Sequence, residues 1–168
     1  MLKKSKILHI GIDDTDSPKG MCTTYLSYEI VKFLKKQKVQ LLDYPSLIRF
    51  NPNIPWKTRG NGAVRLTIKT NEPQKIKNKI TQFVATYSDI KNGANPGLVF
   101  YQNEPIPLLF QKFSNQALWK LISRKKAKQF VSENKIDSFY LGNGQGLIGA
   151  IGAIGYKFSD HTFELLCY

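Results

Sequence analysis

The sequence is poor in the residues that build disulfide frameworks and zinc sites. It has two cysteines, Cys22 and Cys167, and two histidines among its 168 residues. The cysteines lie far apart along the chain, and neither has a second cysteine or a histidine cluster at metal-binding spacing. These absences exclude a disulfide-stabilised scaffold and a zinc site, and they favour a reducing compartment.

Long apolar segments are also missing. No stretch reaches the run of about 18 apolar residues that a membrane-spanning helix needs. The N-terminal segment MLKKSKILHIGID has too short an apolar run for a signal peptide. We therefore expect a globular protein of the cytoplasm.

Acidic residues are scarce: 12 Asp and Glu stand against 25 Lys and Arg, which gives a formal charge of +13. Such a surface attracts polyanions, and counterion release makes nucleic acid the first candidate partner. The alternative is a lysine-rich proteome without a specific anionic partner.

The hydrophobic pattern predicts an α+β fold. Strands are expected at 7–12, 39–50 with a break at Pro45, 64–68 and 98–101, and helices at 26–34 and from Pro73 to Tyr87. This order is the βαββαβ unit of ferredoxin-like domains. The rest is predicted to be helical over 105–134, with Ser114 and Ser123 as caps, then a strand at 139–141, a helix at 147–154 and a last strand at 161–168.

The scarce acids gather in GIDDTDSPKGMCTTYL, directly after the first predicted strand. Asp13, Asp14 and Asp16 are hard oxygen ligands, and carboxylates this close repel one another unless a cation or buried donors intervene. Mg²⁺ bound by one or two carboxylates commonly also takes phosphate oxygens, so the cluster predicts a nucleotide substrate. The alternative is a solvated pair with Asp16 capping the loop.

Glycines dominate LGNGQGLIGAIGAIG, residues 141–155. Gly142, Gly144 and Gly146 would let backbone amides approach an anion at the start of a helix. The spacing does not match GxGxxG and the Walker lysine is absent, which disfavours a dinucleotide or P-loop fold. The alternative is a helix whose Gly149 and Gly152 permit close packing.

A third segment, NPNIPWKTRGNGAV, places Trp56, Lys57, Arg59 and Asn61 between prolines and glycines. An aromatic face mixed with cations suits RNA, or the base and phosphates of ATP. The alternative is an ordered surface loop. His9 and His161 are interpreted as structural histidines.

Together, GIDDTDSPKGMCTTYL, LIRFNPNIPWKTRGNGAV, GNGQGLIGAIGAIG and the terminal DHTFELLCY resemble the archaeal tRNA(Ile) 2-agmatinylcytidine synthetase family, over essentially the whole chain. The resemblance implies an ATP-dependent carbon–nitrogen ligase that acts on the wobble cytidine of tRNA(Ile) with a CAU anticodon. The base carbonyl would be activated by phosphorylation, and agmatine would then displace the phosphate.

The resemblance also implies the domain organisation. Residues 1–168 would form a single ATP-dependent cytidine kinase domain, with a ferredoxin-like unit at 1–103 and an extension with the glycine-rich phosphate loop at 104–168. The family's OB-fold and zinc ribbon have no counterpart here, so the chain is expected to be the kinase part alone.

Site residues follow from the same resemblance. Asp13, Asp14 and Asp16 would hold Mg²⁺ against the ATP phosphates, and Thr23 would accept a phosphate, with Thr24 as the fallback. The predicted ATP- and phosphate-binding residues are Lys57, Arg59, Asn61, Gly142, Asn143, Gly144 and Gly146. No residue can be assigned to agmatine. Two other functions stay open: a palm-like metal-dependent nucleotidyl transferase, and a non-catalytic RNA-binding ferredoxin-like module.

Overall fold

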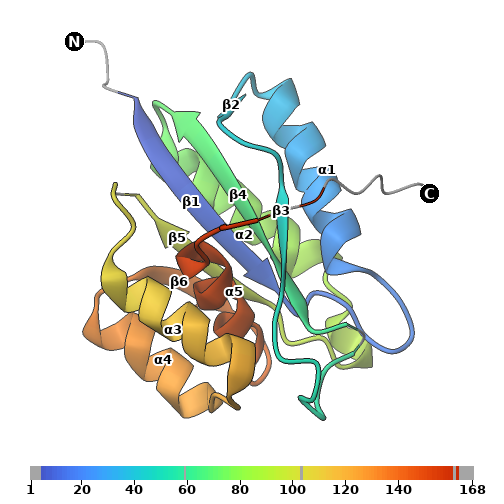
Figure 1. Ribbon diagram of the computed structural model, residues 1–168. Coiled ribbons are helices and arrows are strands. Elements are labelled where there is room, and N and C mark those ends of the chain that lie inside the picture. The colour runs from blue at the N-terminus through green and yellow to red at the C-terminus, as the bar shows by residue number, and fades with distance from the viewer. Residues whose placement is uncertain (1–4, 59, 103, 161, 163–168) are drawn as a thin grey trace.

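A computed structural model describes residues 5–58, 60–102, 104–160 and 162 (Figure 1). The elements, in chain order, are β1 (Lys6–Asp13), α1 (Thr23–Lys36), β2 (Gln40–Leu41), β3 (Ser46–Arg49), β4 (Gly62–Thr70), α2 (Pro73–Tyr87), the 3-10 turn η1 (Ile90–Asn92), β5 (Gly97–Tyr101), α3 (Leu108–Trp119), α4 (Arg124–Glu133), β6 (Asp137–Tyr140) and α5 (Gly146–Gly155). The fold is α+β, as predicted. None of the helices in these ranges has the length and hydrophobicity that a bilayer crossing requires.

The strands form one antiparallel sheet in the order β2-β4-β1-β5-β6, and β3 also pairs with β4. The elements up to β5 follow the βαββαβ order of a ferredoxin-like unit, as predicted. The predicted second strand is split into β2 and β3 on either side of Pro45, because proline cannot donate to a ladder. β6 extends the sheet beside β5.

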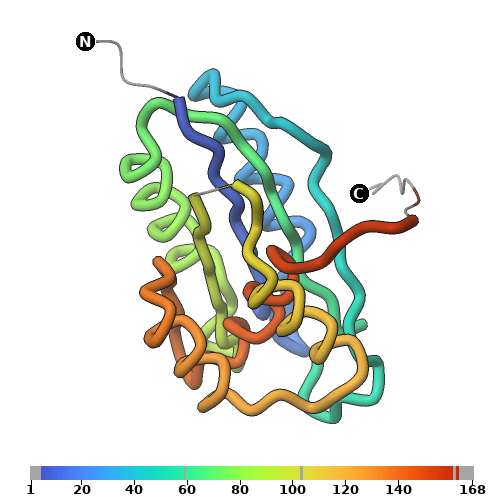
Figure 2. Tube along the Cα trace, turned by 60° about the vertical axis from the view of Figure 1, so that its left-hand side comes forward, coloured from blue at the N-terminus to red at the C-terminus, as the bar shows by residue number. Residues whose placement is uncertain are grey.

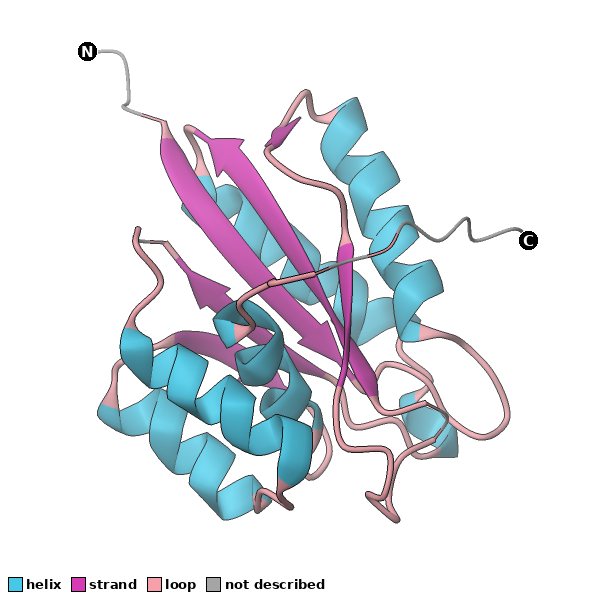
Figure 3. Ribbon diagram, in the orientation of Figure 1, coloured by secondary structure: helices cyan, strands magenta, loops and turns pink. Residues whose placement is uncertain are grey.

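Two hydrophobic cores lie on opposite faces of the sheet (Figure 3). Leu8, Ile10 and Ile12 of β1 point to the face that α1 and α2 cover. On the other face, strand residues such as Val99 pack with α3, α4 and α5, and Ile151 of α5 is fully buried there. Helices therefore cover both faces, as alternation along each strand requires.

The C-terminal half matches the prediction in part. The stretch 105–134 is two helices with a break at 120–123, and Ser123 caps α4 by accepting a hydrogen bond from the Lys126 amide. Ser114 is not a cap: it lies inside α3 with its side chain buried, so that prediction was wrong. The strand predicted at 161–168 lies outside the described residues except Thr162, which is not in a strand.

The sheet and α5 approach so closely that their backbones touch. A Cβ atom built on Gly11 of β1 would lie 2.0 Å from the carbonyl oxygen of Ala150, and one on Gly97 of β5 would lie 2.2 Å from Gly146. No side chain fits between the sheet and the helix at these positions. The packing alternative for the glycine-rich segment is thus confirmed for α5.

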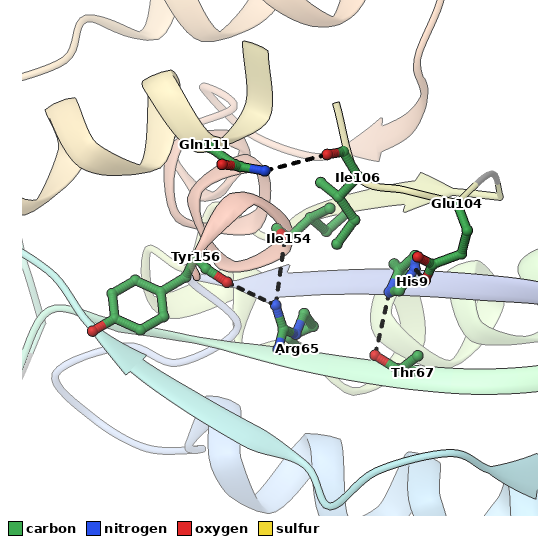
Figure 4. Close-up of polar contacts among 8 residues, drawn as sticks. All are labelled: His9, Arg65, Thr67, Glu104, Ile106, Gln111, Ile154 and Tyr156. Atoms are coloured by element: carbon green, nitrogen blue, oxygen red, sulfur yellow. Dashed lines mark hydrogen bonds and ion pairs between the residues drawn. The ribbon is translucent and has the colours of Figure 1, made fainter. Parts of the chain in front are cut away.

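Beyond the C-terminal end of α5, polar side chains cover the same face of the sheet (Figure 4). His9 is 4% exposed and donates from Nε2 to Glu104 Oε1 at 2.6 Å, while its Nδ1 accepts from Thr67 Oγ1 at 3.3 Å. Arg65 donates to the carbonyl of Tyr156 at 3.0 Å, which satisfies an acceptor at the end of the helix. His9 is therefore structural, as predicted.

Stability should depend on the charge state of His9. Burial lowers the pKa of His9 below 6.5, and the opposing effect of Glu104 does not reverse the shift. The neutral ring is favoured in the folded state, so its stabilising contribution is complete above the unfolded pKa and is lost as the pH falls below it. We expect the free energy of unfolding to fall from about pH 7.5 to about pH 5.5 in the wild type, and to fall less in His9→Gln. Denaturant unfolding of both proteins at the two pH values measures this, and equal slopes would assign the pH dependence to another group.

Candidate active site

The acidic turn begins where β1 ends. Asp13 closes the strand, and Asp14 takes a left-handed backbone conformation with φ of 56°. The Asp14 amide donates to Asp13 Oδ1 at 2.7 Å, and the amide of Gly149 in the first turn of α5 also donates to the Asp13 carboxylate. The absence of a side chain at Gly149 makes room for this carboxylate, since a Cβ there would lie 2.1 Å from Asp13 Oδ2.

Both carboxyl groups hold a proton more tightly than usual. Burial raises the pKa of Asp13 well above its ordinary value, and the neighbouring Asp14 raises it further. Burial and the charge of Asp16 raise the pKa of Asp14 to about 6, a shift that the Asn95 amide only partly offsets. Asp14 Oδ2 is buried without a hydrogen-bond partner, so the desolvation of this oxygen is uncompensated.

Asp16 faces a different environment from that of the other two acids. Its Oδ1 accepts from Thr23 Oγ1 at 3.1 Å and its Oδ2 accepts from Thr58 Oγ1 at 2.9 Å. Thr15 completes the group, because its amide and its hydroxyl both donate to Thr23 Oγ1. Asp16 therefore ties the acidic turn to α1 and to the loop that carries Trp56.

The arrangement is not a ready-made metal cage. In the described ranges, no group of three or more His, Cys, Asp or Glu side chains is placed to hold a metal ion. Asp13 and Asp14 are adjacent, whereas both oxygens of Asp16 accept hydroxyl hydrogen bonds. Two carboxylates suffice for Mg²⁺ when phosphates supply other ligands. The uncompensated oxygen of Asp14 and the raised pKa values of the pair fit such a cation.

The two threonines that follow the acids lie at the start of α1. Thr23 is 6% exposed, and its hydroxyl donates to Asp16 while it accepts two hydrogen bonds from Thr15. Thr24 is partly buried, and its hydroxyl lies 3.0 Å from Cys22 Sγ. Phosphate acceptance by Thr23 stays a prediction, and in this conformation its hydroxyl is fully occupied.

The glycine-rich turn is held together by its own amides. Gly142 and Gly144 have φ of 61° and 80°, which glycine adopts without a steric cost. The amide of Gly144 donates to Leu141, and the amides of Asn143 and Gly146 donate to the side chain and the backbone of Asn95. These three amides stabilise the turn, so the predicted phosphate cradle would have to use other donors or another conformation.

A pocket of about 350 Å³ opens next to the acids. It brings together Asp13, Lys57, Asn61 and Asn143, which the sequence placed in three separate motifs. The complete lining is Asp13, Phe50, Ile54, Trp56, Lys57, Asn61, Ala117, Lys120, Leu121, Ile122, Ser123, Arg124, Asn143, Gln145, Ile148 and Gly149. Arg59 lies outside the described residues, and Gly142, Gly144 and Gly146 are not among the lining residues.

One wall of the pocket was missed by sequence reasoning. Residues between Ala117 and Arg124, at the end of α3 and the start of α4, line the pocket together with Trp56 and Lys57. Gln145 fastens the Trp56 loop by donating from Nε2 to the Trp56 carbonyl at 2.9 Å. The signal that could have found the missed wall is the run WKLISRKK, which mixes an aromatic residue with cations.

The Thr58–Asp16 hydrogen bond should position the Trp56 loop. We expect Thr58→Val to lower the free energy of unfolding by about 1–3 kcal/mol, because a hydrogen bond to a largely buried carboxylate is lost. We also expect ATP to bind more weakly, whereas Thr58→Ser should resemble the wild type. Chemical denaturation and calorimetric titration with ATP measure the two effects. Equal behaviour of the Val and Ser variants would show that the bond does not hold the loop.

Comparisons with known proteins agree on one group. A family model described as the TiaS TCKD domain matches residues 9–75. The 2-agmatinylcytidine synthetase TiaS of Cenarchaeum symbiosum, named for its isoleucine tRNA, is 47% identical over 161 residues, which are 96% of this chain and 36% of that protein. The corresponding TiaS of Pyrococcus horikoshii is 39% identical over 165 residues, or 96% of this chain and 38% of that protein.

Solved structures give the same result. A crystal structure of TiaS in complex with its isoleucine tRNA and ATP matches with a TM-score of 0.86 and 31% identity, over 92% of this chain and 37% of that one. A complex of TiaS with the same tRNA, AMPCPP and agmatine matches with a TM-score of 0.84 and 29% identity, over 92% and 37%. The chain thus spans little more than a third of the length of the relatives that it matches.

Proposed function

The chain belongs to the TiaS family over the part of those proteins that includes the TCKD domain, and from this premise we propose that it is the ATP-using kinase part of a tRNA(Ile)-cytidine agmatine ligase. It transfers a phosphoryl group from ATP to the base carbonyl oxygen of the wobble cytidine in the CAU anticodon. The amine of agmatine then attacks the activated carbon, and phosphate leaves with the carbonyl oxygen. The product is 2-agmatinylcytidine.

One observation carries this proposal: a pair of desolvated carboxyl groups lies beside a pocket with apolar and cationic walls. Trp56, Ile148 and Phe50 offer surfaces on which a base can stack or pack, and Lys57 supplies a phosphate partner from the exposed loop. Asp13 reaches the same pocket from the end of β1. Base, phosphates and acids can therefore meet within the length of one nucleotide.

We assign Mg²⁺ binding to Asp13 and Asp14. The buried Oδ2 of Asp14, which has no hydrogen-bond partner, and the raised pKa values of both groups fit a bound cation better than they fit a carboxylate pair alone. When bound, Mg²⁺ would supply charge neutralisation for the transferring phosphoryl group. Asp16, a predicted ligand, is assigned to positioning because Thr23 and Thr58 already donate to its two oxygens.

The residues of the pocket have distinct roles in this proposal. Lys57 and Arg59 contact phosphates, and Asn61 holds the loop by donating from Nδ2 to the Asn51 carbonyl at 2.6 Å. Asn143 contributes to the pocket from the glycine-rich turn. Thr23 serves as a phosphate acceptor only after its hydrogen bonds to Thr15 and Asp16 have opened.

Residues 1–168 act as one domain in this proposal, since a single core joins the ferredoxin-like unit to the extension. Val99 and Ala63 of the unit pack with Phe110 and Ile154 of the extension. Agmatine and much of the tRNA would be bound together with the remaining length of the relatives, which includes the OB-fold and zinc ribbon expected for the family. A palm-like transferase is disfavoured because residues 44–71 contain no acid that could add a third ligand from the neighbouring strands.

The test is phosphoryl transfer to RNA. The chain is incubated with tRNA(Ile) bearing the CAU anticodon and ATP labelled at the α- or γ-phosphate, with and without agmatine. We expect γ-label on the RNA without agmatine, and its release as phosphate when agmatine is added. A tRNA whose wobble cytidine is replaced by uridine is the matched control. ATP binding without any RNA-dependent transfer would favour the non-catalytic RNA-binding alternative.

A further inference from the structure

The corner between α3 and α4 exposes a large aromatic side chain next to the pocket. Trp119, the last residue of α3, is 80% exposed, and Leu121 in the connection is 58% exposed. The corner is fixed in place: Asn51 donates from Nδ2 to the Trp119 carbonyl at 3.3 Å, and its amide donates to Ala117. Figure 2 shows this connection running beside the loop that follows β3. An exposed tryptophan on an anchored backbone therefore stands at the rim of the site.

Positive charge surrounds this tryptophan. Lys120, Arg124, Lys125 and Lys126 are all exposed, and residues 105–132 contain no Asp or Glu. The loop with Trp56 and Lys57 belongs to a second acid-free stretch, residues 44–71. In a chain with 12 acids, the charged residues that these two stretches contribute to the pocket are thus all cationic, and Asp13 is the one acid in the lining.

We propose that the α3–α4 corner is a binding surface for single-stranded RNA. An unpaired base stacks on the Trp119 ring, and the adjoining phosphates contact Arg124 and Lys125. This inference rests on the proposed function, because the bound strand is the one that delivers its target nucleotide to the pocket. Trp119 would hold a neighbour of that nucleotide, outside the ATP subsite.

The chemistry of the corner favours RNA over a protein partner. A protein-binding patch would need contiguous apolar surface, whereas here Trp119 and Leu121 are interrupted by cations. Aromatic rings that alternate with Lys and Arg are typical of surfaces that bind unpaired nucleotides, since every base has a face that can stack. Paired bases are already stacked on their neighbours, so duplex RNA should not use the ring.

Tryptophan fluorescence can test the contact at a single residue. The chain has two tryptophans, Trp56 and Trp119, so Trp56→Phe leaves Trp119 as the only tryptophan. The probe is an RNA stem-loop with the CAU anticodon loop of tRNA(Ile), and a fully paired RNA of equal length is the control. We expect the stem-loop to quench Trp119 and the duplex to leave its emission unchanged. Equal quenching by both RNAs, or by neither, overturns the proposal.

Affinity gives a second, independent measurement. We expect Trp119→Ala to weaken binding of the stem-loop about 5- to 100-fold, which corresponds to the loss of one base–aromatic stack. The double substitution Arg124→Ala/Lys125→Ala should weaken binding and lower the slope of log K against log salt by about 1.4. Lys35→Ala/Lys36→Ala, at the exposed end of α1, removes the same charge and should leave the slope unchanged. An equal decrease in the two double variants would reduce the effect to net charge and overturn the proposal.

The outcome is separable from that of the proposed function. Trp119→Ala should still bind ATP as the wild type does, because Trp119 does not line the pocket. If wild type and Trp119→Ala bind the stem-loop equally while γ-label still reaches tRNA, the corner fails and the function stands. If label never reaches tRNA while Trp119 is quenched by unpaired RNA, the function fails and the surface stands. Trp119 emission that changes with protein concentration in the absence of RNA would indicate self-association and contradict the proposal.

Discussion

Asp14→Asn is expected to abolish ATP-dependent labelling of tRNA and, at the same time, to make the protein more stable. Removal of one preorganised charged group from a phosphoryl-transfer site typically lowers the rate by a factor of about 10² to 10³. Asn is the appropriate replacement because it tolerates the left-handed backbone at this position, where φ is 56°. The substitution removes the charge and leaves the shape of the turn.

The gain in stability follows from the pKa of Asp14. Burial raises this pKa to about 6, so ionisation of the carboxyl group opposes folding. The penalty is complete above about pH 6 and disappears as the pH falls toward the unfolded value of 3.8. A shift of this size corresponds to about 2–3 kcal/mol, which should raise the Tm of Asp14→Asn by about 5 °C at neutral pH.

Thermal unfolding and label transfer, measured on the same preparations, check both parts. Asp89→Asn is the control variant, because Asp89 is a partly exposed acid outside the pocket whose pKa is lowered by hydrogen bonds from Ser17 and Asn92. It should retain label transfer and gain no stability. Transfer that survives in Asp14→Asn would remove the catalytic role of this residue, and a Tm that falls would show that the acid stabilises the turn.

Gly11→Ala is expected to prevent the chain from reaching its folded state. The added methyl group would lie 2.0 Å from the Ala150 carbonyl oxygen, and both partners are backbone atoms of buried central elements. Overpacking of side chains costs about 1–3 kcal/mol because side chains can move aside. Here β1 or α5 would have to shift as a whole, so we expect a loss of more than about 4 kcal/mol.

Gly20→Ala is the matched control for this prediction. The nearest atom to its added methyl group would be Asp89 Oδ2 at 3.9 Å, an ordinary contact. We expect its stability to lie within about 0.5 kcal/mol of the wild type. Far-ultraviolet circular dichroism and the soluble yield of both variants provide the measurement. A folded Gly11→Ala protein with the Tm of the wild type would mean that the sheet and the helix lie farther apart than described.

Much of the fold is predictable because it depends on local periodicity. The alternation of Val64, Leu66 and Ile68 with polar residues identified β4, and Pro73 marked the start of α2. Ser114 was misassigned for a physical reason: serine is common at caps, but at this position it is buried inside α3 by contacts that only the tertiary structure provides.

The candidate site was predictable only in part. The position of Asp13 at the end of a strand follows from the sequence, because a short β-branched run stops there. The sequence could not show that Asp16 turns to Thr58, since 42 residues separate the two. It also could not show that the amides of the glycine-rich turn are used internally, because their acceptor, Asn95, precedes the turn by nearly fifty residues. The wall between Ala117 and Arg124 belongs to no phosphate motif, so only the spatial arrangement reveals it.

The close contact between β1 and α5 has a consequence for biosynthesis. β1 leaves the ribosome first, yet the helix that seals one of its faces is among the last segments to be made. At about 5–20 residues per second, the nascent chain must wait roughly ten to thirty seconds with that face uncovered. Chaperones that shield exposed strands should therefore bind the emerging polypeptide, and translation that stops before Gly146 should release a chain that cannot mature.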